Sequence, residues 1–367
     1  IRDNPLLRTG AFRNGALYSA HWTGRGGNQQ FGYFLSAGYD TEDGTLPNNG
    51  FDRRSGRANV SWVAAPTLKL DASFGLTRAN YALPNNDNNI YGYLGGALLG
   101  SPLTRSDATG PSNDGWFGFA RQIAAISAIE NTQQTHRAIA TAQANWTPTS
   151  WMSHRVTVGA DLTRDEVAVF FPRNEIGQYG GVLNTGSIAE TRVGAERYTI
   201  DYLGNAELRT GGAWTHHASL GFQVIDTRVE TVGATGQGLP TPIARSISQA
   251  SITSGLQSFA VTRQVGVLGQ WQVGYRNRLF VQAGARLDAN SSFGNTSRWF
   301  FLPKLGASYV LSDEPFWQDG LGVINTLRLR AAYGVTGRAP TPDAALATLA
   351  AVPYLDGIVP KAGLVPL

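Results

Sequence analysis

The stretch that decides the fold reads Arg278-Leu-Phe-Val-Gln-Ala-Gly-Ala-Arg-Leu-Asp288. Its odd-numbered residues from 279 to 287 are all aliphatic or small, whereas polar residues and glycine dominate the other register: Arg278, Gln282, Gly284, Arg286 and Asp288. Successive side chains leave opposite faces of a β-strand, so a period of two predicts a strand with one apolar and one polar face. The same alternation recurs in residues 265–273, 305–311 and 326–336, which predicts four consecutive strands.

The composition of the two faces indicates where these strands lie. The apolar face is rich in small and aliphatic residues, with Tyr and Trp near the strand ends, and the other face carries Arg, Gln, Asp and Gly. Segments of about ten residues with this alternation, separated by short turns and long loops, are typical of transmembrane β-barrels. The apolar face would meet lipid and the polar face would line the lumen. The sequence therefore predicts an all-β, antiparallel transmembrane barrel.

The pattern extends back to about residue 17 and gives about twelve strands. The longest break is a loop at 81–132, in which residues 121–131 favour a short helix. Because long loops of such barrels are extracellular, the short turns are assigned to the periplasmic side. These short turns are expected at 24–28, 65–66, 147–150, 210–213 and 274–277, and the position of the longer connection at 312–323 makes it periplasmic too.

Composition excludes several other classes of protein. Only 15% of the 367 residues are charged, against about 25% in soluble globular domains. No apolar run reaches the length of about 18 residues that a transmembrane helix needs. The absence of cysteine excludes disulfides and thiolate chemistry. The net charge of +4 is spread thinly, without a block of like charges, so nucleic acid is not expected as a partner.

Motifs for catalysis and metal binding are missing. There is no G-x-S-x-G, P-loop or H-E-x-x-H pattern. His216 and His217 are adjacent, so on a strand they point to opposite faces and cannot chelate one metal. No serine is marked as the partner of His136 or His154, and the Asn-rich run 85–89 lacks the acidic residues and glycine of a calcium loop. We therefore expect no enzyme activity, no cofactor and no metal site.

A family resemblance is carried by the same region. The run Arg286-Leu-Asp-Ala-Asn-Ser-Ser-Phe-Gly294 resembles the R-x-D-G-S-S-x-F-G element of SusC/RagA-type TonB-dependent transporters, with Ala289 and Asn290 where Gly and Ser are usual. Residues 31–60 resemble the early barrel strands of that family. Three later segments are similar to its barrel in content, order and spacing: 301–309, 312–316 and 327–337.

The resemblance implies a fold and a function. It implies that residues 1–337 form part of a 22-stranded barrel, that 338–367 begin a further extracellular loop, and that a plug domain and more strands lie outside this chain. It implies active import of large nutrients, either oligosaccharides or oligopeptides, across the outer membrane of a Gram-negative-type bacterium. The implied partners are a SusD-like surface lipoprotein, the TonB complex acting through the plug, outer-membrane lipid, and a glycan or peptide ligand.

Two groups of side chains are candidates for contact with cargo. The first lies in the longest loop, where flat aromatic faces could stack on sugar rings or grip peptide side chains: Trp116, Phe117 and Phe119. Their alternative role is packing within the loop or against a partner. The second is the predicted lumen-lining row: Arg278, Gln282, Arg286, Arg328 and Arg330. Its alternative role is a salt-bridge lattice with neighbouring strands and the plug.

Two other functions stay open at the level of sequence. One is a barrel without transport activity whose loops anchor other surface proteins, distinguished by whether a plug and a TonB motif lie upstream. The other is a self-closed twelve-stranded pore or barrel enzyme, which requires the first strand to pair with the twelfth. Twelve strands left open would present two unpaired edges to hydrocarbon, which is not viable in a bilayer.

Overall fold

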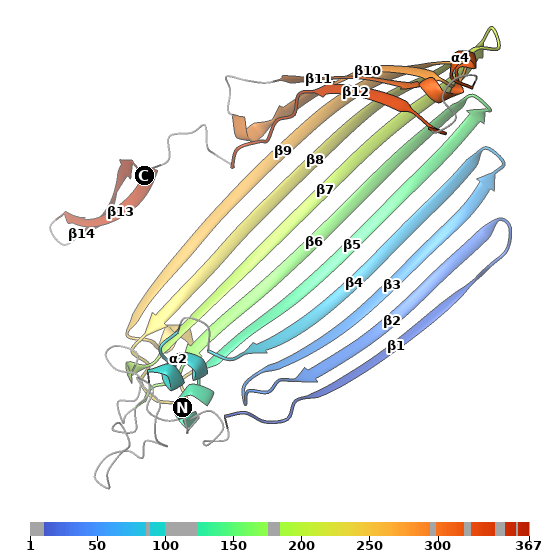
Figure 1. The fold of residues 1–367 in the computed structure, drawn as a ribbon. Coiled ribbons are helices and arrows are strands. Elements are labelled where there is room, and N and C mark those ends of the chain that lie inside the picture. Colours follow the sequence, from blue (N-terminus) through green and yellow to red (C-terminus); the bar gives the residue numbers. More distant parts are fainter. Residues whose placement is uncertain are drawn as a thin grey trace.

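The computed structural model describes residues 11–85, 89–99, 123–174, 184–293, 299–318, 324–341, 349–356 and 359–366. Twelve strands form one sheet in the order β1 to β12, and every strand runs antiparallel to its neighbours in sequence. Figure 1 shows this sheet as a curved, open surface of long tilted strands. The all-β, antiparallel fold and the number of strands predicted from the alternation are confirmed.

The strands are longer than the alternation alone indicates. They are β1 (Ala16–Gly27), β2 (Phe31–Asp43), β3 (Gly50–Ala65), β4 (Leu68–Leu83), β5 (Glu130–Thr149), β6 (Met152–Phe171), β7 (Ser187–Thr210), β8 (Trp214–Gln237), β9 (Ile252–Tyr275), β10 (Leu279–Asn290), β11 (Phe300–Val310) and β12 (Arg328–Gly334). A tilted strand crosses a bilayer in about 9–11 residues. The 24 residues of each of β7, β8 and β9 therefore extend far beyond the hydrocarbon on the loop side.

The sheet does not close on itself. Within the described residues, β1 pairs with β2 alone and β12 pairs with β11 alone. In Figure 1 β1 and β12 lie at opposite edges of the curve. A self-closed twelve-stranded pore is therefore not what these strands form.

The two faces of the sheet differ in chemistry and in crowding. Along β2 the apolar face (Phe31, Tyr33, Leu35, Ala37 and Tyr39) is exposed, and the intervening positions are half-buried. Side chains converge on the inner side of a curved sheet and splay apart on the outer side. We therefore assign the polar face to the concave side and the apolar face to the convex side, as the barrel prediction requires.

Aromatic side chains mark the short-turn end of the convex face. The ring of His154 stacks between Trp146 and Tyr202, with centroids 5.2 and 6.1 Å away. Trp214 packs on Tyr275 at 4.6 Å. Aromatic girdles of this kind lie at the membrane interfaces of outer-membrane barrels, so these rings mark one boundary of the lipid-facing belt.

Most of the predicted turns are confirmed, and one is shifted. Gly211 and Gly212 have φ of +57° and +68° in the turn between β7 and β8. The turn predicted at 24–28 is wrong, because β1 continues to Gly27 and the chain reverses at 28–30. There the Asn28 side-chain oxygen accepts bonds from the backbone N–H groups of Gln30 and Phe31.

The glycines at the end of β1 serve packing rather than turning. A Cβ on Gly24 would meet the Trp22 ring at 2.9 Å, and a Cβ on Gly26 would meet the Tyr33 hydroxyl at 2.7 Å. The missing side chains make room for two rings of the convex face. This is a close approach that only glycine permits without a shift of the ring.

At the loop end of the sheet the connections build small cores of their own. The predicted helix within 121–131 is present as α3 (Ile123–Ser127), and α2 (Tyr93–Leu98) precedes it. One core consists of Ala11, Leu46, Tyr93 and Ile126, and another consists of Phe170, Ile188, Leu239 and Ala244. Burial raises the pKa of Tyr93, whose hydroxyl shares a 2.7 Å hydrogen bond with Ser127. None of the described helices is long and apolar enough to span a membrane.

The remaining elements are short. They are the 3₁₀ helices η3 (Ile247–Gln249), η4 (Ser291–Phe293) and η5 (Leu311–Asp313), the helix α4 (Pro315–Gln318), and the strands β13 (Leu349–Asp356) and β14 (Val359–Pro366). β13 and β14 pair with each other as a separate hairpin. The sequence analysis expected a loop at 338–367 and did not predict these two strands.

Candidate functional site

The predicted lumen-lining residues share the concave face of the sheet. Gln282 on β10 lies opposite Gly306 on β11, and Arg330 on β12 lies opposite Ser308. By the period of two, Arg286 and Arg328 project from this same face. Arg278 precedes β10 and bonds across to Glu314. Residues that are far apart in the sequence are thus brought to one surface by the register of three strands.

Two of these arginines are held in a polar lattice. The Arg278 guanidinium donates to Glu314 at 2.9 Å, and the Tyr309 hydroxyl donates to the other oxygen of that carboxylate at 3.1 Å. The Arg286 guanidinium donates to Asp288 at 2.6 Å and to the Gln223 side-chain oxygen at 2.9 Å. This is the lattice between neighbouring strands that the sequence analysis weighed as the alternative role of the row.

The other three residues leave polar groups on the concave surface. Gln282 and Arg330 line a hollow of about 230 Å³ together with Gln272 and Phe280. Arg328 and Arg330 are exposed, and neither forms an ion pair with a described residue. Their guanidinium groups are therefore available to a carboxylate or another acceptor.

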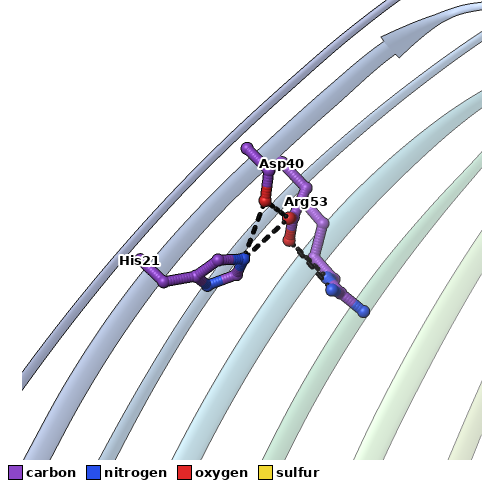
Figure 2. A network of polar contacts seen from close by, with 4 residues as sticks. His21, Asp40 and Arg53 are labelled. Carbon is purple, nitrogen blue, oxygen red and sulfur yellow. Dashed lines mark hydrogen bonds and ion pairs between the residues drawn. The ribbon is translucent and has the colours of Figure 1, made fainter.

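A second polar cluster lies at the opposite edge of the sheet, on β1, β2 and β3 (Figure 2). The Ser19 hydroxyl donates to Asp40 at 2.6 Å and lies 2.8 Å from Nε2 of His21. The Arg53 guanidinium donates to the other Asp40 oxygen at 2.9 and 3.1 Å. The register causes this cluster, because Ser19, Asp40 and Arg53 are directly opposite one another on three adjacent strands.

The cluster has the residue types of a hydrolase triad without its geometry. In a Ser–His–Asp triad one imidazole nitrogen faces the serine and the other faces the aspartate. Here the same nitrogen, Nε2 of His21, lies 2.8 Å from the Ser19 hydroxyl and 3.1 Å from Asp40. Figure 2 shows this nitrogen directed at Asp40. The arrangement orients a carboxylate between a hydroxyl, an imidazole and a guanidinium. It is an ion-paired cluster on the concave face, and the sequence analysis did not find it.

Between the two clusters the centre of the concave face carries further polar pairs. Arg137 on β5 forms a two-bond ion pair with Asp161 on β6, at 2.6 and 2.9 Å. The Gln223 amide on β8 donates to Asp201 on β7 at 2.6 Å. The polar lattice thus recurs from one edge of the sheet to the other. The signal for it in the sequence is the polar half of the alternation in each strand.

The remaining candidates are placed as follows. Trp116, Phe117 and Phe119 lie outside the described residues. His216 and His217 point to opposite faces, as predicted: the His216 ring stacks on Trp271 at 5.8 Å, and His217 lies 3.8 Å from Glu207. Over the described ranges of the chain, no cluster of three His, Cys, Asp or Glu side chains is suited to hold a metal ion.

An antiparallel sheet with an exposed apolar outside and an ion-paired polar inside defines a segment of an outer-membrane β-barrel. The chain belongs to the TonB-dependent receptor-like β-barrel family, whose model matches residues 85–359. The resemblance to TonB-dependent transporters and the outer-membrane location are therefore confirmed.

Individual relatives agree with this assignment. The chain is 21% identical to TonB-dependent receptors P26 and P3 of Formosa agariphila, over 88% and 89% of its own length. It spans 32% and 33% of the length of these two relatives. Its fold matches a solved structure of the RagAB peptide transporter with a TM-score of 0.79 at 18% identity, covering 99% of this chain and 41% of that one. The Escherichia coli outer-membrane transporter YddB matches with a TM-score of 0.52 at 10% identity, over 87% of this chain and 38% of that one.

Proposed function

We propose that this chain is part of the barrel of a TonB-dependent importer that carries large nutrients through the outer membrane. The observation that supports it most is the ion-paired polar lattice on the concave face, present from β1 to β11. A face that packed against an apolar core would not carry so many charges, whereas a water-filled passage requires a polar wall. The family membership gives this wall its role, and import by such a barrel makes and breaks no covalent bond in the cargo.

The two open edges support a domain organisation for the assembled barrel. Unpaired backbone groups at β1 and β12 would be costly in hydrocarbon, so further strands must pair with both edges in the assembled barrel. Residues 1–337 then form about half of a 22-stranded barrel, and residues 338–367 belong to an extracellular loop that includes the β13–β14 hairpin. A plug domain, reached by TonB, would fill the lumen and pack on the concave lattice.

The cargo is an oligopeptide or an oligosaccharide delivered with a SusD-like surface lipoprotein. The similarity in fold to the RagAB peptide transporter favours the peptide. Within the barrel, the lumen-lining row divides into two roles. Arg278 and Arg286 stiffen the wall, and Gln282, Arg328 and Arg330 face cargo or plug. Trp116, Phe117 and Phe119 in the longest loop supply flat surfaces for the first contact with cargo.

Uptake by cells that lack the gene, with and without complementation, tests this function. Fluorescent oligopeptide and oligosaccharide mixtures are supplied separately, and each is repeated in a strain without TonB. Uptake of one class that needs both the gene and TonB supports the proposal and identifies the cargo class. Uptake that needs the gene but not TonB identifies a passive barrel, and uptake of neither class favours the surface-anchoring role.

The intact mass of the protein isolated from outer membranes tests the domain organisation separately. About three times the 39.3 kDa of this chain is expected from its share of the relatives. A mass of 39.3 kDa would contradict both the missing plug and the missing strands.

A further inference from the structure

Along the strands, the convex face changes from apolar to basic side chains at one level of the sheet. On β4 the outward residues from Leu68 to Leu76 are all apolar, and the next outward residue is Arg78. On β5 the outward residues from Trp146 to Ala138 are tryptophan and alanine, and the next is His136. Each apolar run covers about nine residues, close to the 9–11 that a tilted strand needs to cross the hydrocarbon. The first outward basic residue of each strand therefore lies at the membrane boundary nearer the long loops.

Four basic residues occupy this boundary on four adjacent strands. We call Arg54, Arg78, His136 and Arg164 the cationic row. The register places Arg54 opposite Arg78, Arg78 opposite His136, and His136 opposite Arg164. Directly opposite side chains have Cβ atoms about 5 Å apart, and like charges in such positions are destabilising. Arg54 and Arg78 are the directly opposed cations of the row, and an anion between them would offset their repulsion.

The described part of the protein offers few carboxylates to the residues of the cationic row. Arg78 and His136 form no ion pair with any carboxylate in the described part of the chain, and Arg54 reaches Asp52 only at 4.0 Å. Arg164 shares the single carboxylate of Glu166 with Arg192, at 3.3 and 3.7 Å. All four members of the row are exposed. The row is therefore most strongly cationic at Arg54 and Arg78.

The surface around the row is hollowed. A depression of about 990 Å³ is lined by the row and by Arg192, with Glu196 and Glu230 at its far side. On the membrane side it is lined by apolar residues of the belt: Leu76, Ala138 and Leu162. A ligand in this depression would meet cations with one part and aliphatic side chains with the other.

We propose that the cationic row binds the phosphate groups of an anionic lipid headgroup in the outer leaflet. The position at the edge of the apolar belt selects a lipid over a soluble anion, because the acyl chains of a lipid lie along the belt while its phosphates reach the arginines. Planar guanidinium groups match phosphate oxygens with two parallel hydrogen bonds. The row thereby holds a shell of lipid around strands β3 to β6.

Native mass spectrometry of the protein isolated from outer membranes and delipidated in detergent tests this site. The probes are diphosphoryl lipid A, the same lipid after removal of both phosphates, and inorganic phosphate. Diphosphoryl lipid A is expected to bind, and the dephosphorylated lipid and free phosphate are expected to bind at least tenfold more weakly. The triple substitution R54Q/R78Q/R164Q is expected to weaken lipid A binding about a hundredfold, as each basic residue near an anionic membrane surface contributes about a factor of five.

The matched control is R25Q/R155Q/R209Q, which removes the same charge from strand residues outside the row. Arg228 is left in place, because it lies opposite Glu196 of the depression. The control is expected to leave lipid A binding unchanged. The single variants R78Q and R78K separate folding from binding, because R78K keeps the charge and should retain most of the affinity. Equal binding by the two triple variants, equal binding of the dephosphorylated lipid, or full competition by inorganic phosphate at the same concentration would each overturn the proposal.

Discussion

The concave and convex faces of this sheet differ in how their charged side chains are paired. On the concave face several cations have carboxylate partners within the sheet, as in Arg53 with Asp40, Arg137 with Asp161 and Arg286 with Asp288. On the convex face the strands carry no charge through the belt, and on β3 and β4 the first cations beyond it, Arg54 and Arg78, stand opposite one another. The same alternation thus produces a concave face that pairs many of its own charges and a convex face on which Arg54 and Arg78 lack a close counter-charge among the described residues. The difference shows that only the outer face marks the boundary of the lipid, through the change from apolar to basic residues along its strands.

The largest effect is expected from a charge placed in the belt. Val158 points outward in the middle of the β6 apolar run, and Thr157 points inward beside it. The substitution Val158→Arg should destabilise the barrel by about 2–4 kcal/mol, because the arginine must enter hydrocarbon. Thr157→Arg should cost less than Val158→Arg, because residue 157 lies on the polar face of the sheet and stays out of hydrocarbon. Guanidinium unfolding of the protein in lipid vesicles measures both, and equal costs would contradict the assignment of the two faces.

A smaller effect is expected from removal of a cation inside the lattice. Arg286→Gln leaves Asp288, which is 21% exposed, without its ion-pair partner and also removes the bond to Gln223. The expected loss is about 1–3 kcal/mol, the cost of a poorly solvated group left unpaired. Arg330→Gln is the control on the same face, since that side chain has no ion pair among the described residues. Its unfolding midpoint should not move, and a loss equal to that of Arg286→Gln would show that the lattice is not the cause.

The sequence predicted those features that depend on local periodicity. The alternation at 278–288 and 326–336 gives strands, and it also places Gln282 and Arg330 on one face, because a period of two fixes which way each side chain points. It does not give the register between strands. The cluster of Ser19, His21 and Asp40 depends on register alone, so no local pattern could identify it.

Other features were hidden by composition. β8 and β9 run into a segment rich in Gly, Ser and Thr at 231–237 and 252–258, where the hydrophobic alternation fades although the strands continue. The connection between the two strands is therefore only 238–251, shorter than the Gly-, Ser- and Thr-rich composition of 233–255 indicates. The turn at 28–30 is stabilised by the side chain of Asn28. The glycines just before it, Gly24 and Gly26, belong to β1 and leave space for the rings of Trp22 and Tyr33.

Mutant cycles on the concave face test whether its charges attract. The pair Arg137 and Asp161 is joined by two hydrogen bonds but is about half exposed. Half-exposed pairs contribute about 0.2–1 kcal/mol, so the cycle of R137A, D161A and the double variant should show a favourable coupling of that size. Raising the salt concentration should reduce the coupling. A coupling of zero at low salt would mean that the two side chains lie close together without contributing to the free energy of unfolding.

The smallest effect should have the opposite sign and lies on the convex face. Arg54 and Arg78 are directly opposite, and like charges in such positions repel by about 0.2–1 kcal/mol. In neutral detergent the cycle of R54Q, R78Q and the double variant should therefore show an unfavourable coupling, and each single variant should stabilise the barrel slightly. Adding diphosphoryl lipid A should reverse the sign, because an anion between the two guanidinium groups converts their repulsion into a shared attraction. If the sign stays the same with and without the lipid, no anion lies between these two side chains. A reversal would mean that a lipid supplies to Arg54 and Arg78 the counter-charge that carboxylates of the sheet supply to Arg53, Arg137 and Arg286 on the inner face.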